Sequence, residues 1–235
     1  KPEREHTPNV ASAFAAFGSC LVLKLCRKGK TGRRRTPLAV LPDGTNEEGE
    51  DLAQPLSFAK ADLRDVVLYG TEFSPPCVKL RCLMNYYGVP FQKVNGKHPK
   101  SSYSKIPVLE LNGRQVNDSH IIVKNLIPVL TGVPLTEEEL AWEKKITFEF
   151  QPAIEVELFG SGPDIAKFAR LEGLQKFLAE ILGPLLGLLI GNVFRQRYNF
   201  ETPSSGYGKQ FRSAMGSKAF FHGDSPGPVD LCLYG

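Results

Sequence analysis

Short blocks of hydrophobic residues, each with its own spacing, begin at residue 65. Asp65 to Tyr69 is an apolar run of the kind that forms a buried strand. Apolar residues then recur at helical spacing from Cys77 to Tyr87, and Gly88 suits the end of that helix. Phe91 to Val94 predicts a second strand, close enough to the first for a right-handed β-α-β unit. The helical spacing is carried by Val78, Cys82, Leu83 and Tyr86.

A hairpin and a further helix follow. Residues 108–116 predict two short strands joined by an Asn-Gly turn at 112–113, which is a strong hairpin signal. Residues 118–130 have apolar positions at helical spacing, and Pro128 is expected to end or kink that helix early. The order β-α-β, connection, β-β-α predicts a thioredoxin-like domain over residues 63–131.

The signals in residues 134–235 are mostly helical and predict an all-α domain. Leu185 to Phe194 is apolar on nearly every side, which predicts a helix at the centre of a bundle or, alternatively, in a membrane. These ten residues are too few to span a bilayer, which takes about 20, so we favour the buried position. The elements expected here are helices at 137–149, 163–182 and 185–198, a loop at 204–209, and a helix that starts around Gly227, Pro228 and Asp230.

Residues 1–62 lack this patterning and are expected to lie outside the folded domains. Residues 9–26 are apolar and rich in small side chains, and an acid-free basic run to Arg35 follows, as in a targeting sequence. A membrane anchor and a disordered tail are the alternatives. Residues 36–62 resemble a linker with little to bury. We expect a plastid or mitochondrial location or membrane association, with the cytoplasm as the alternative.

Charge and cysteine content narrow the function classes. The net charge is +4, but without the seven basic residues between Lys24 and Arg35 the chain is slightly acidic. A nucleic-acid-binding domain needs a concentrated basic surface, so we expect no nucleic-acid partner. The five cysteines form no regular framework, which indicates a reducing compartment. The chain starts with Lys, and we expect it to be incomplete at both ends.

Three short motifs within the first domain point to one pocket. They are a Ser-Pro-Pro-Cys helix start at 74–77, a Lys-Ile-Pro-Val-Leu segment at 105–109 and an Asn-Asp-Ser segment at 117–119. A hydroxyl and a thiol at one helix start, a predicted cis-proline before a strand, and an Asp-Ser pair opening another helix form three sides of a small site. Such a site suits a thiol tripeptide.

These motifs resemble a known family. A thioredoxin-like domain followed by a helical domain is the glutathione transferase arrangement, and within it the chain is most similar to the type-2 prostaglandin E synthases. The resemblance is carried by segments 101–109, 116–119, 138–142 and 223–235 and covers about residues 65 to 235. It implies a helical transferase domain at 134–235, truncated at its end, and an N-terminal segment associated with a membrane or organelle.

The sequence departs from the family pattern at three positions. The family usually has Cys-Pro-x-Cys at the helix start, and Ser74 replaces the first cysteine here. A family tyrosine three residues earlier corresponds to Thr71, and Gly227 stands where a Ser, Thr or Asn helix cap is common. A Ser-Pro-Pro-Cys start is more similar to the serine-type transferases.

Ser74 and Cys77 are the candidate catalytic residues. The Ser74 hydroxyl is expected to cap the helix and, as the resemblance implies, to donate to the glutathione sulfur and favour its thiolate. Free N–H groups of the first turn would add to this effect. Cys77 is either a small buried side chain or a thiol that forms a mixed disulfide with glutathione.

Ile106, Pro107, Asp118 and Ser119 are the candidate glutathione-binding residues. A cis bond at Pro107 would turn the backbone of Ile106 toward the site, where it pairs with the cysteinyl backbone like an added strand. Ser119 at a helix start could hold the γ-glutamyl carboxylate. Asp118 could pair with the γ-glutamyl ammonium.

The leading hypothesis is a glutathione-dependent transferase, or an isomerase of a lipid peroxide as the resemblance implies. Its partners would be glutathione and an apolar electrophile, with peripheral membrane association and a homodimer as further hypotheses. Haem enters only through the resemblance, and the histidine and cysteine spacing suggests no metal site. The alternatives are a non-catalytic binding module and a glutaredoxin-like thiol-disulfide oxidoreductase.

Overall fold

The computed structural model describes residues 51–235 except positions 73, 102, 169–171, 199 and 202. The expectations for residues 9–35 and for most of the linker therefore fall outside the described residues. A short 3-10 helix at Lys60–Asp62 leads into the first domain.

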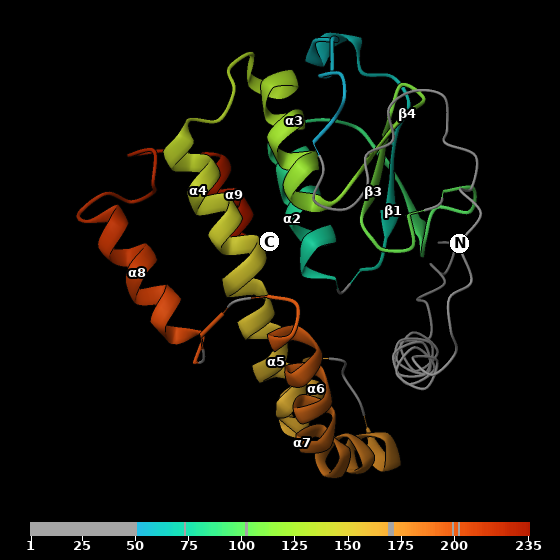
Figure 1. Cartoon of the computed structure of the whole chain (residues 1–235), viewed down its shortest axis with the longest axis vertical. Coiled ribbons are helices and arrows are strands. Elements are labelled where there is room, and N and C mark those ends of the chain that lie inside the picture. Colours follow the sequence, from blue (N-terminus) through green and yellow to red (C-terminus); the bar gives the residue numbers. More distant parts are fainter. Residues whose placement is uncertain (1–50, 73, 102, 169–171, 199, 202) are drawn as a thin grey trace, which may run out of the picture.

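The first domain is a four-stranded sheet with two helices on one face, which confirms the predicted thioredoxin-like architecture (Figure 1). The strand order is β2-β1-β3-β4, with β1 and β2 parallel and the other two pairs antiparallel. The elements are β1 (Val66–Gly70), α2 (Pro75–Tyr86), β2 (Gln92–Asn95), β3 (Val108–Leu111), β4 (Arg114–Asn117) and α3 (Ser119–Thr131).

Alternation along the strands gives the sheet one apolar face and one polar face. Paired residues share a face because side chains alternate with period two. The face toward the helices carries the buried residues Val66, Leu68, Leu109, Leu111 and Val116. The opposite face carries Tyr69, Glu110, Gln115 and Asn117.

The buried face of α2 differs from the predicted one. Of the four residues that carried the helical spacing, only Leu83 is buried, and Tyr86 is 49% exposed. Two overlapping sets of positions in this helix have helical spacing, and the spacing alone does not choose between them. The buried residues are Cys77, Lys79, Leu80, Leu83 and Met84.

Pro128 does not end α3, contrary to the prediction. The helix continues to Thr131 and stops at Gly132, which has a φ of 77°. The proline removes one N–H from the last turn, but its own carbonyl still accepts from the Gly132 N–H at 2.9 Å. The left-handed conformation at Gly132 therefore terminates the helix.

The second domain is helical, and several of its predicted boundaries were wrong. The helix predicted at 137–149 continues through a turn of π-helix into α5, where Pro152 has no N–H to donate to residue 148. The helices predicted at 163–182 and 185–198 are α6 and one long α7, and the loop predicted at 204–209 is the start of α8. The elements are α4 (Glu137–Lys145), the π-helix η2 (Ile146–Phe150), α5 (Gln151–Gly160), α6 (Gly162–Phe168), α7 (Gly173–Arg195), α8 (Ser205–Met215) and α9 (Pro228–Tyr234).

The start of α9 follows the prediction. Pro228 occupies the first helical position, and the Asp230 carboxylate accepts the Gly227 N–H at 2.9 Å and the Phe221 N–H at 2.9 Å. The helix packs against α2 and α4, so it joins the two domains (Figure 1).

The prediction that Leu185 to Phe194 is buried at the centre of a bundle was wrong. α7 packs against α5 and α6 through its glycines, and a Cβ on Gly187 would overlap the backbone of Gly160. Leu185, Leu188 and Leu189 of this segment are exposed, at 55%, 66% and 37%. The span Lys176–Arg195, with mean hydropathy 1.9 and 19% burial, is long and apolar enough to cross a membrane by length and composition alone.

Glu155 on α5 predicts a pH-dependent stability. Burial raises the pKa of this half-buried carboxyl from 4.5 to about 7. The folded protein therefore holds a proton that the unfolded chain releases, and stability should fall by up to about 3 kcal/mol as the pH rises from 4.5 to 7. Glu155→Gln should remove this fall in urea titrations at several pH values, whereas the exposed Glu180→Gln should keep it. An unchanged fall in Glu155→Gln would contradict the assignment.

Candidate functional site

The strand register brings the three predicted motifs to one edge of the sheet. Val108 pairs with Tyr69 of β1 and with Asn117 of β4. The turn after β1, residue 107 before β3 and residue 118 after β4 are therefore neighbours. Paired residues of antiparallel strands lie about 4.5–5.5 Å apart between Cα atoms. We call this end of the sheet, with Ser74, Pro107 and Asp118, the site edge.

Ser74 is the N-cap residue just before α2, but its side chain makes no capping hydrogen bond, contrary to the prediction. The first two helical positions are Pro75 and Pro76, which have no N–H to cap. The next two N–H groups, of Cys77 and Val78, both donate to the Ser74 carbonyl at 2.9 Å. The prediction that free N–H groups of this turn face the site was therefore also wrong, and the Ser74 hydroxyl, which contacts the Cys77 thiol, is the side-chain donor of this turn.

Cys77 lies behind Ser74 and is 1% exposed. A Cβ at Gly70 would overlap its Sγ, so the thiol packs directly on the end of β1. Burial raises the pKa of the Cys77 thiol, and the Ser74 side chain and the Thr71 backbone offset only part of that effect. A buried thiol with a raised pKa fits the structural interpretation of Cys77 better than the nucleophile.

The Ile106–Pro107 peptide bond is cis, as predicted. The segment before it is held on the polar face of the sheet. His98 Nε2 lies 2.8 Å from Glu110 Oε1, and the Tyr69 hydroxyl donates to Glu110 Oε2 at 3.0 Å. The segment that leads to Pro107 is therefore held on one side by these contacts and on the other side by β3.

Asp118 and Ser119 open α3, as predicted, and both are buried. Asp118 Oδ1 accepts the His120 N–H at 2.9 Å. Its backbone has a φ of 70° and a ψ of 121°, which costs a residue with a side chain about 1–3 kcal/mol. Helix geometry leaves the N–H groups of Ser119 and Ile121 without a partner inside the helix. One carboxylate oxygen of Asp118 therefore caps the helix. The strained backbone of Asp118 directs the start of α3 toward the site edge.

A buried polar cluster behind the site edge was not predicted. Lys79 Nζ lies 2.7 Å from Glu143 Oε1 and donates to Thr147 Oγ1 at 2.7 Å. The other oxygen of Glu143 contacts Nδ1 of His120, next to Ser119. The cluster joins α2, α3 and α4, so it ties both helix starts of the site edge to the helical domain.

Glu143 is ionised within this cluster. Its burial would raise the pKa of its carboxyl, but the charge of Lys79 and the contact with His120 outweigh burial and lower the pKa to about 2. The only sequence signal was a lysine about one turn into the helix, which is more often a solvated side chain.

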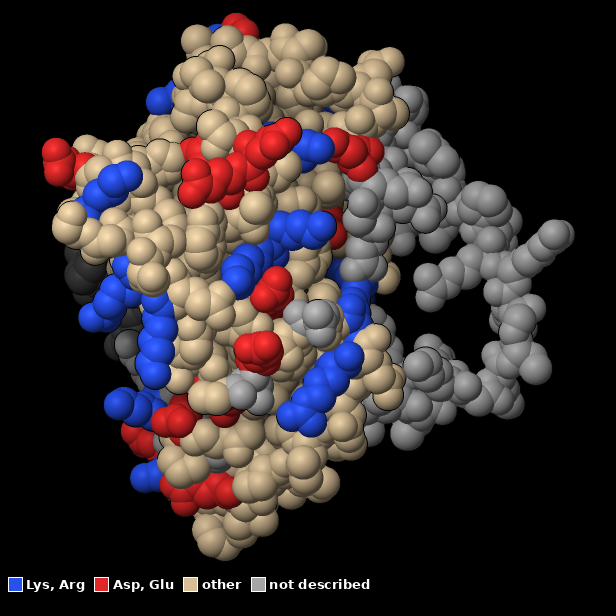
Figure 2. Space-filling model, turned by 60° about the vertical axis from the view of Figure 1, so that its left-hand side comes forward, with Lys and Arg blue, Asp and Glu red and all other residues tan. Residues whose placement is uncertain are grey.

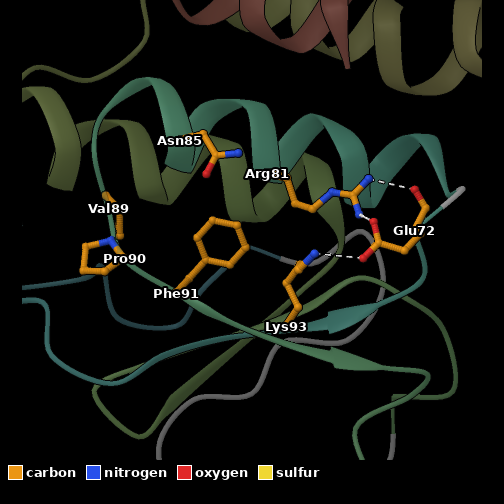
Figure 3. A pocket seen from close by; sticks show the side chains of 7 residues that line it. All are labelled: Glu72, Arg81, Asn85, Val89, Pro90, Phe91 and Lys93. Atoms are coloured by element: carbon orange, nitrogen blue, oxygen red, sulfur yellow. Dashed lines mark hydrogen bonds and ion pairs between the residues drawn. The ribbon is translucent and has the colours of Figure 1, made fainter. Parts of the chain in front are cut away.

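A pocket of about 540 Å³ lies between α2 and β2 (Figure 3). Arg81 and Lys93 converge on the Glu72 carboxylate at its polar end, with 3.0 Å between Lys93 Nζ and Glu72 Oε1. Pro90 and Phe91 line the other end. None of the six candidate site residues lines this pocket, so it is separate from the site edge.

Charges of both signs are interspersed on the face shown in Figure 2. Acidic and basic side chains alternate across that face without merging into one basic field.

Comparison with known proteins identifies the fold. Residues 75–163 match the model of the glutathione S-transferase N-terminal domain, from the first residue of α2 into α6. No curated protein matches the sequence. With the thioredoxin-like sheet and the helical domain that follows it, the chain has a glutathione-transferase-like fold.

Solved structures similar to the chain include several glutathione transferases. The beta-etherase LigF from Sphingobium sp. is 13% identical, with a TM-score of 0.49 over 73% of this chain and 82% of that one. A glutathione S-transferase from Pseudomonas fluorescens is 16% identical, with a TM-score of 0.45 over 73% and 82%. A rice transferase in complex with glutathione is 21% identical, with a TM-score of 0.38 over 72% and 73%.

Proposed function

We propose that this chain is a member of the glutathione transferase superfamily that binds glutathione at the site edge and adds its sulfur to an apolar electrophile. The observation that carries the proposal is the register that sets Ser74, Pro107 and Asp118 at one end of the sheet. The family-model match over residues 75–163 supports it, because it includes Cys77, Pro107, Asp118 and Ser119.

The tripeptide would lie along the start of β3. The backbone N–H and C=O of Ile106 would pair with the cysteinyl residue of glutathione as in an added strand. The Ser119 hydroxyl and the open N–H groups of α3 would hold the γ-glutamyl carboxylate. The Asp118 oxygen that does not serve the helix would accept from the γ-glutamyl ammonium. The strained backbone of Asp118 fits this role, since such conformations cluster at ligand sites.

The sulfur would lie next to the Ser74 hydroxyl at the start of α2. Because Pro75 and Pro76 carry no N–H, the Ser74 O–H and the helix dipole are what this turn offers to a thiolate. The hydroxyl donates to the sulfur and stabilises its charged form, and the thiolate then attacks the electrophile. The proton released from the thiol goes to solvent.

The position of Cys77 helps to separate the transferase from the alternative functions. A glutaredoxin-like oxidoreductase needs an exposed thiol of low pKa, and the Cys77 thiol is buried with a raised pKa. A binding module without catalysis would share the same ligand contacts, so only turnover separates it from a transferase. The finer form of the proposal is that the electrophile is a lipid peroxide, as in a type-2 prostaglandin E synthase.

Glutathione and its sulfonate analogue should raise the thermal stability of the protein. A ligand at a hundredfold excess over its Kd should add about 2.7 kcal/mol to the free energy of unfolding. Asp118→Asn keeps an oxygen for the His120 N–H and removes the charge, so it should weaken binding tenfold or more at equal fold stability. The matched control is Asp224→Asn, at an exposed carboxylate.

No stabilisation by either ligand would overturn the proposal. Equal affinity in Asp118→Asn and the unchanged protein would remove Asp118 from the site. Binding without turnover of a simple electrophile or a lipid peroxide would favour the binding module.

A further inference from the structure

The pocket between α2 and β2 combines a cationic end with an apolar end. Its volume of about 540 Å³ falls within the range of small-molecule sites, about 300–1,000 Å³. Arg81 and Lys93 lie at one end, Val89 and Pro90 lie at the other, and the Phe91 ring lies between them (Figure 3). The pocket therefore offers both kinds of surface that an amphipathic small molecule needs.

A carboxylate of the protein itself already lies at the cationic end. Arg81 Nη1 contacts one oxygen of the Glu72 carboxylate, and Lys93 Nζ lies 3.0 Å from the other. The hydrogen bond from Lys93 and the charge of Arg81 lower the pKa of the Glu72 carboxyl, so Glu72 is ionised at neutral pH. The other lining residues are uncharged, so two cations and one anion leave the pocket with a net charge of +1. This balance indicates a monoanion as the ligand.

Lys93 and Asn85 have hydrogen-bond donors that are still open. An ammonium carries three N–H groups, and Glu72 is the single hydrogen-bond partner of Lys93 among the described residues. The side-chain amide of Asn85, which also lines the pocket, makes no hydrogen bond within the described part of the chain. A carboxylate in the pocket can accept from both, and its bond with the ammonium is of the stronger, charge-assisted kind.

The apolar end of the pocket is held in place by the core of the first domain. Val89 belongs to that core, and Phe91 packs against it. Pro90 stands between them with the fixed φ of its ring. Ligand sites are usually formed before the ligand arrives, and a flat aromatic ring is well suited to pack on Phe91.

We propose that this pocket binds a small aromatic monocarboxylate. The carboxylate accepts from Lys93 and Asn85 beside Glu72, and the ring packs on Phe91 and Pro90. The pocket contains none of the candidate glutathione-binding residues, so this inference stands independently of the proposed function.

Titration calorimetry on the full chain, with naphthoate and its neutral amide as probes, tests the proposal. Naphthoate should bind with one-to-one stoichiometry and at least about tenfold more tightly than naphthamide, because the amide lacks the charge. Higher salt should weaken the binding of naphthoate, since Lys93 is 57% exposed and its charge is screened. Saturating glutathione should leave the affinity for naphthoate unchanged.

Three variants locate the bound acid. Lys93→Gln should weaken the binding of naphthoate about tenfold. Glu72→Gln should strengthen it about three- to tenfold, because the variant removes the anion next to the ligand. Lys97→Gln, at an exposed lysine outside the pocket, is the matched control and should bind as the unchanged protein does. Far-UV circular dichroism should be the same for all of them, because none of the substituted side chains is buried.

No binding of naphthoate at millimolar concentration, or equal affinity for naphthoate and naphthamide, would overturn the proposal. An affinity unchanged by Lys93→Gln would also overturn it, since the acid would then lie elsewhere on the protein. Weaker binding in Glu72→Gln would contradict the placement of the ligand beside Glu72. Displacement of naphthoate by glutathione would assign the acid to the site edge. Binding of naphthoate by a protein that does not bind glutathione would keep this second site and overturn the proposed function alone.

Discussion

Glu143→Gln should lower the free energy of unfolding by about 3–5 kcal/mol, the effect of removing one partner of a buried ion pair. Lys79 and Glu143 are 0% and 1% exposed, and their charged atoms lie 2.7 Å apart. The glutamine keeps the size of the side chain but leaves the Lys79 ammonium without an anion. Urea unfolding measures the loss, with Glu138→Gln, an exposed acid of the same helix, as the control that stays within about 0.5 kcal/mol.

The double variant Lys79→Met with Glu143→Gln should recover part of the loss, because no uncompensated charge then remains buried. A Glu143→Gln protein as stable as the unchanged one would contradict the importance of the pair. Equal losses in the single and double variants would show that packing, not charge, is responsible.

Glu143 should also make the free energy of unfolding depend on pH in acid. The pKa of Glu143 is about 2 in the folded protein against 4.5 for an ordinary glutamate. Between these values the unfolded chain binds a proton that the folded protein does not, so stability rises with pH through this window. The contribution of about 3 kcal/mol is fully present above pH 4.5 and is lost as the pH falls toward 2. Glu143→Gln should remove this fall in the free energy of unfolding between pH 4.5 and about 2.

The sheet domain was predictable because its signals are local. The Asn-Gly turn at 112–113 fixes the hairpin, since both residues adopt a positive φ. The hairpin register then places residues 107 and 118 side by side, which follows from the sequence once the strands are known. The three motifs of the site edge were found for this reason.

The helical domain was less predictable because spacing does not say which side of a helix finds a neighbour. α7 has glycines on one side and leucines on the other, and either side can be buried. The close contact between Gly187 and Gly160 determines which side of α7 is buried. These two residues are far apart in the sequence. Ser204 to Lys209 is rich in serine and glycine, yet it begins α8, whose Tyr207 and Phe211 are buried in the core.

The buried contacts around the site edge were likewise not predictable from local sequence. Lys79 and Glu143 are 64 residues apart, and nothing local to either residue pairs them. The absence of free N–H groups at the start of α2 was in contrast visible in the sequence, since Pro75 and Pro76 stand there. The rule that helix starts offer N–H groups holds only where the residues carry them.

Ser74→Ala should raise the pKa of the enzyme-bound glutathione thiol by about one to two units, the equivalent of a charge-assisted hydrogen bond of about 1.5–3 kcal/mol. The effect should be large because Pro75 and Pro76 supply no N–H in this turn and the Cys77 N–H already donates to the Ser74 carbonyl. At neutral pH the smaller thiolate fraction should lower kcat/KM about 10- to 100-fold. The ultraviolet absorbance of the thiolate, followed against pH, measures the shift directly.

The pH profile separates this role from a structural one. As the pH rises above the new thiol pKa, kcat/KM of Ser74→Ala should recover toward that of the unchanged protein, because the hydroxyl acts on the thiolate fraction. Ser213→Ala, at an exposed serine of α8, should leave both the pKa and the rate unchanged. Cys77→Ser should likewise keep most of the activity, since its thiol is buried. If Cys77→Ser abolishes turnover while Ser74→Ala keeps it, the thiol and not the hydroxyl is the catalytic group.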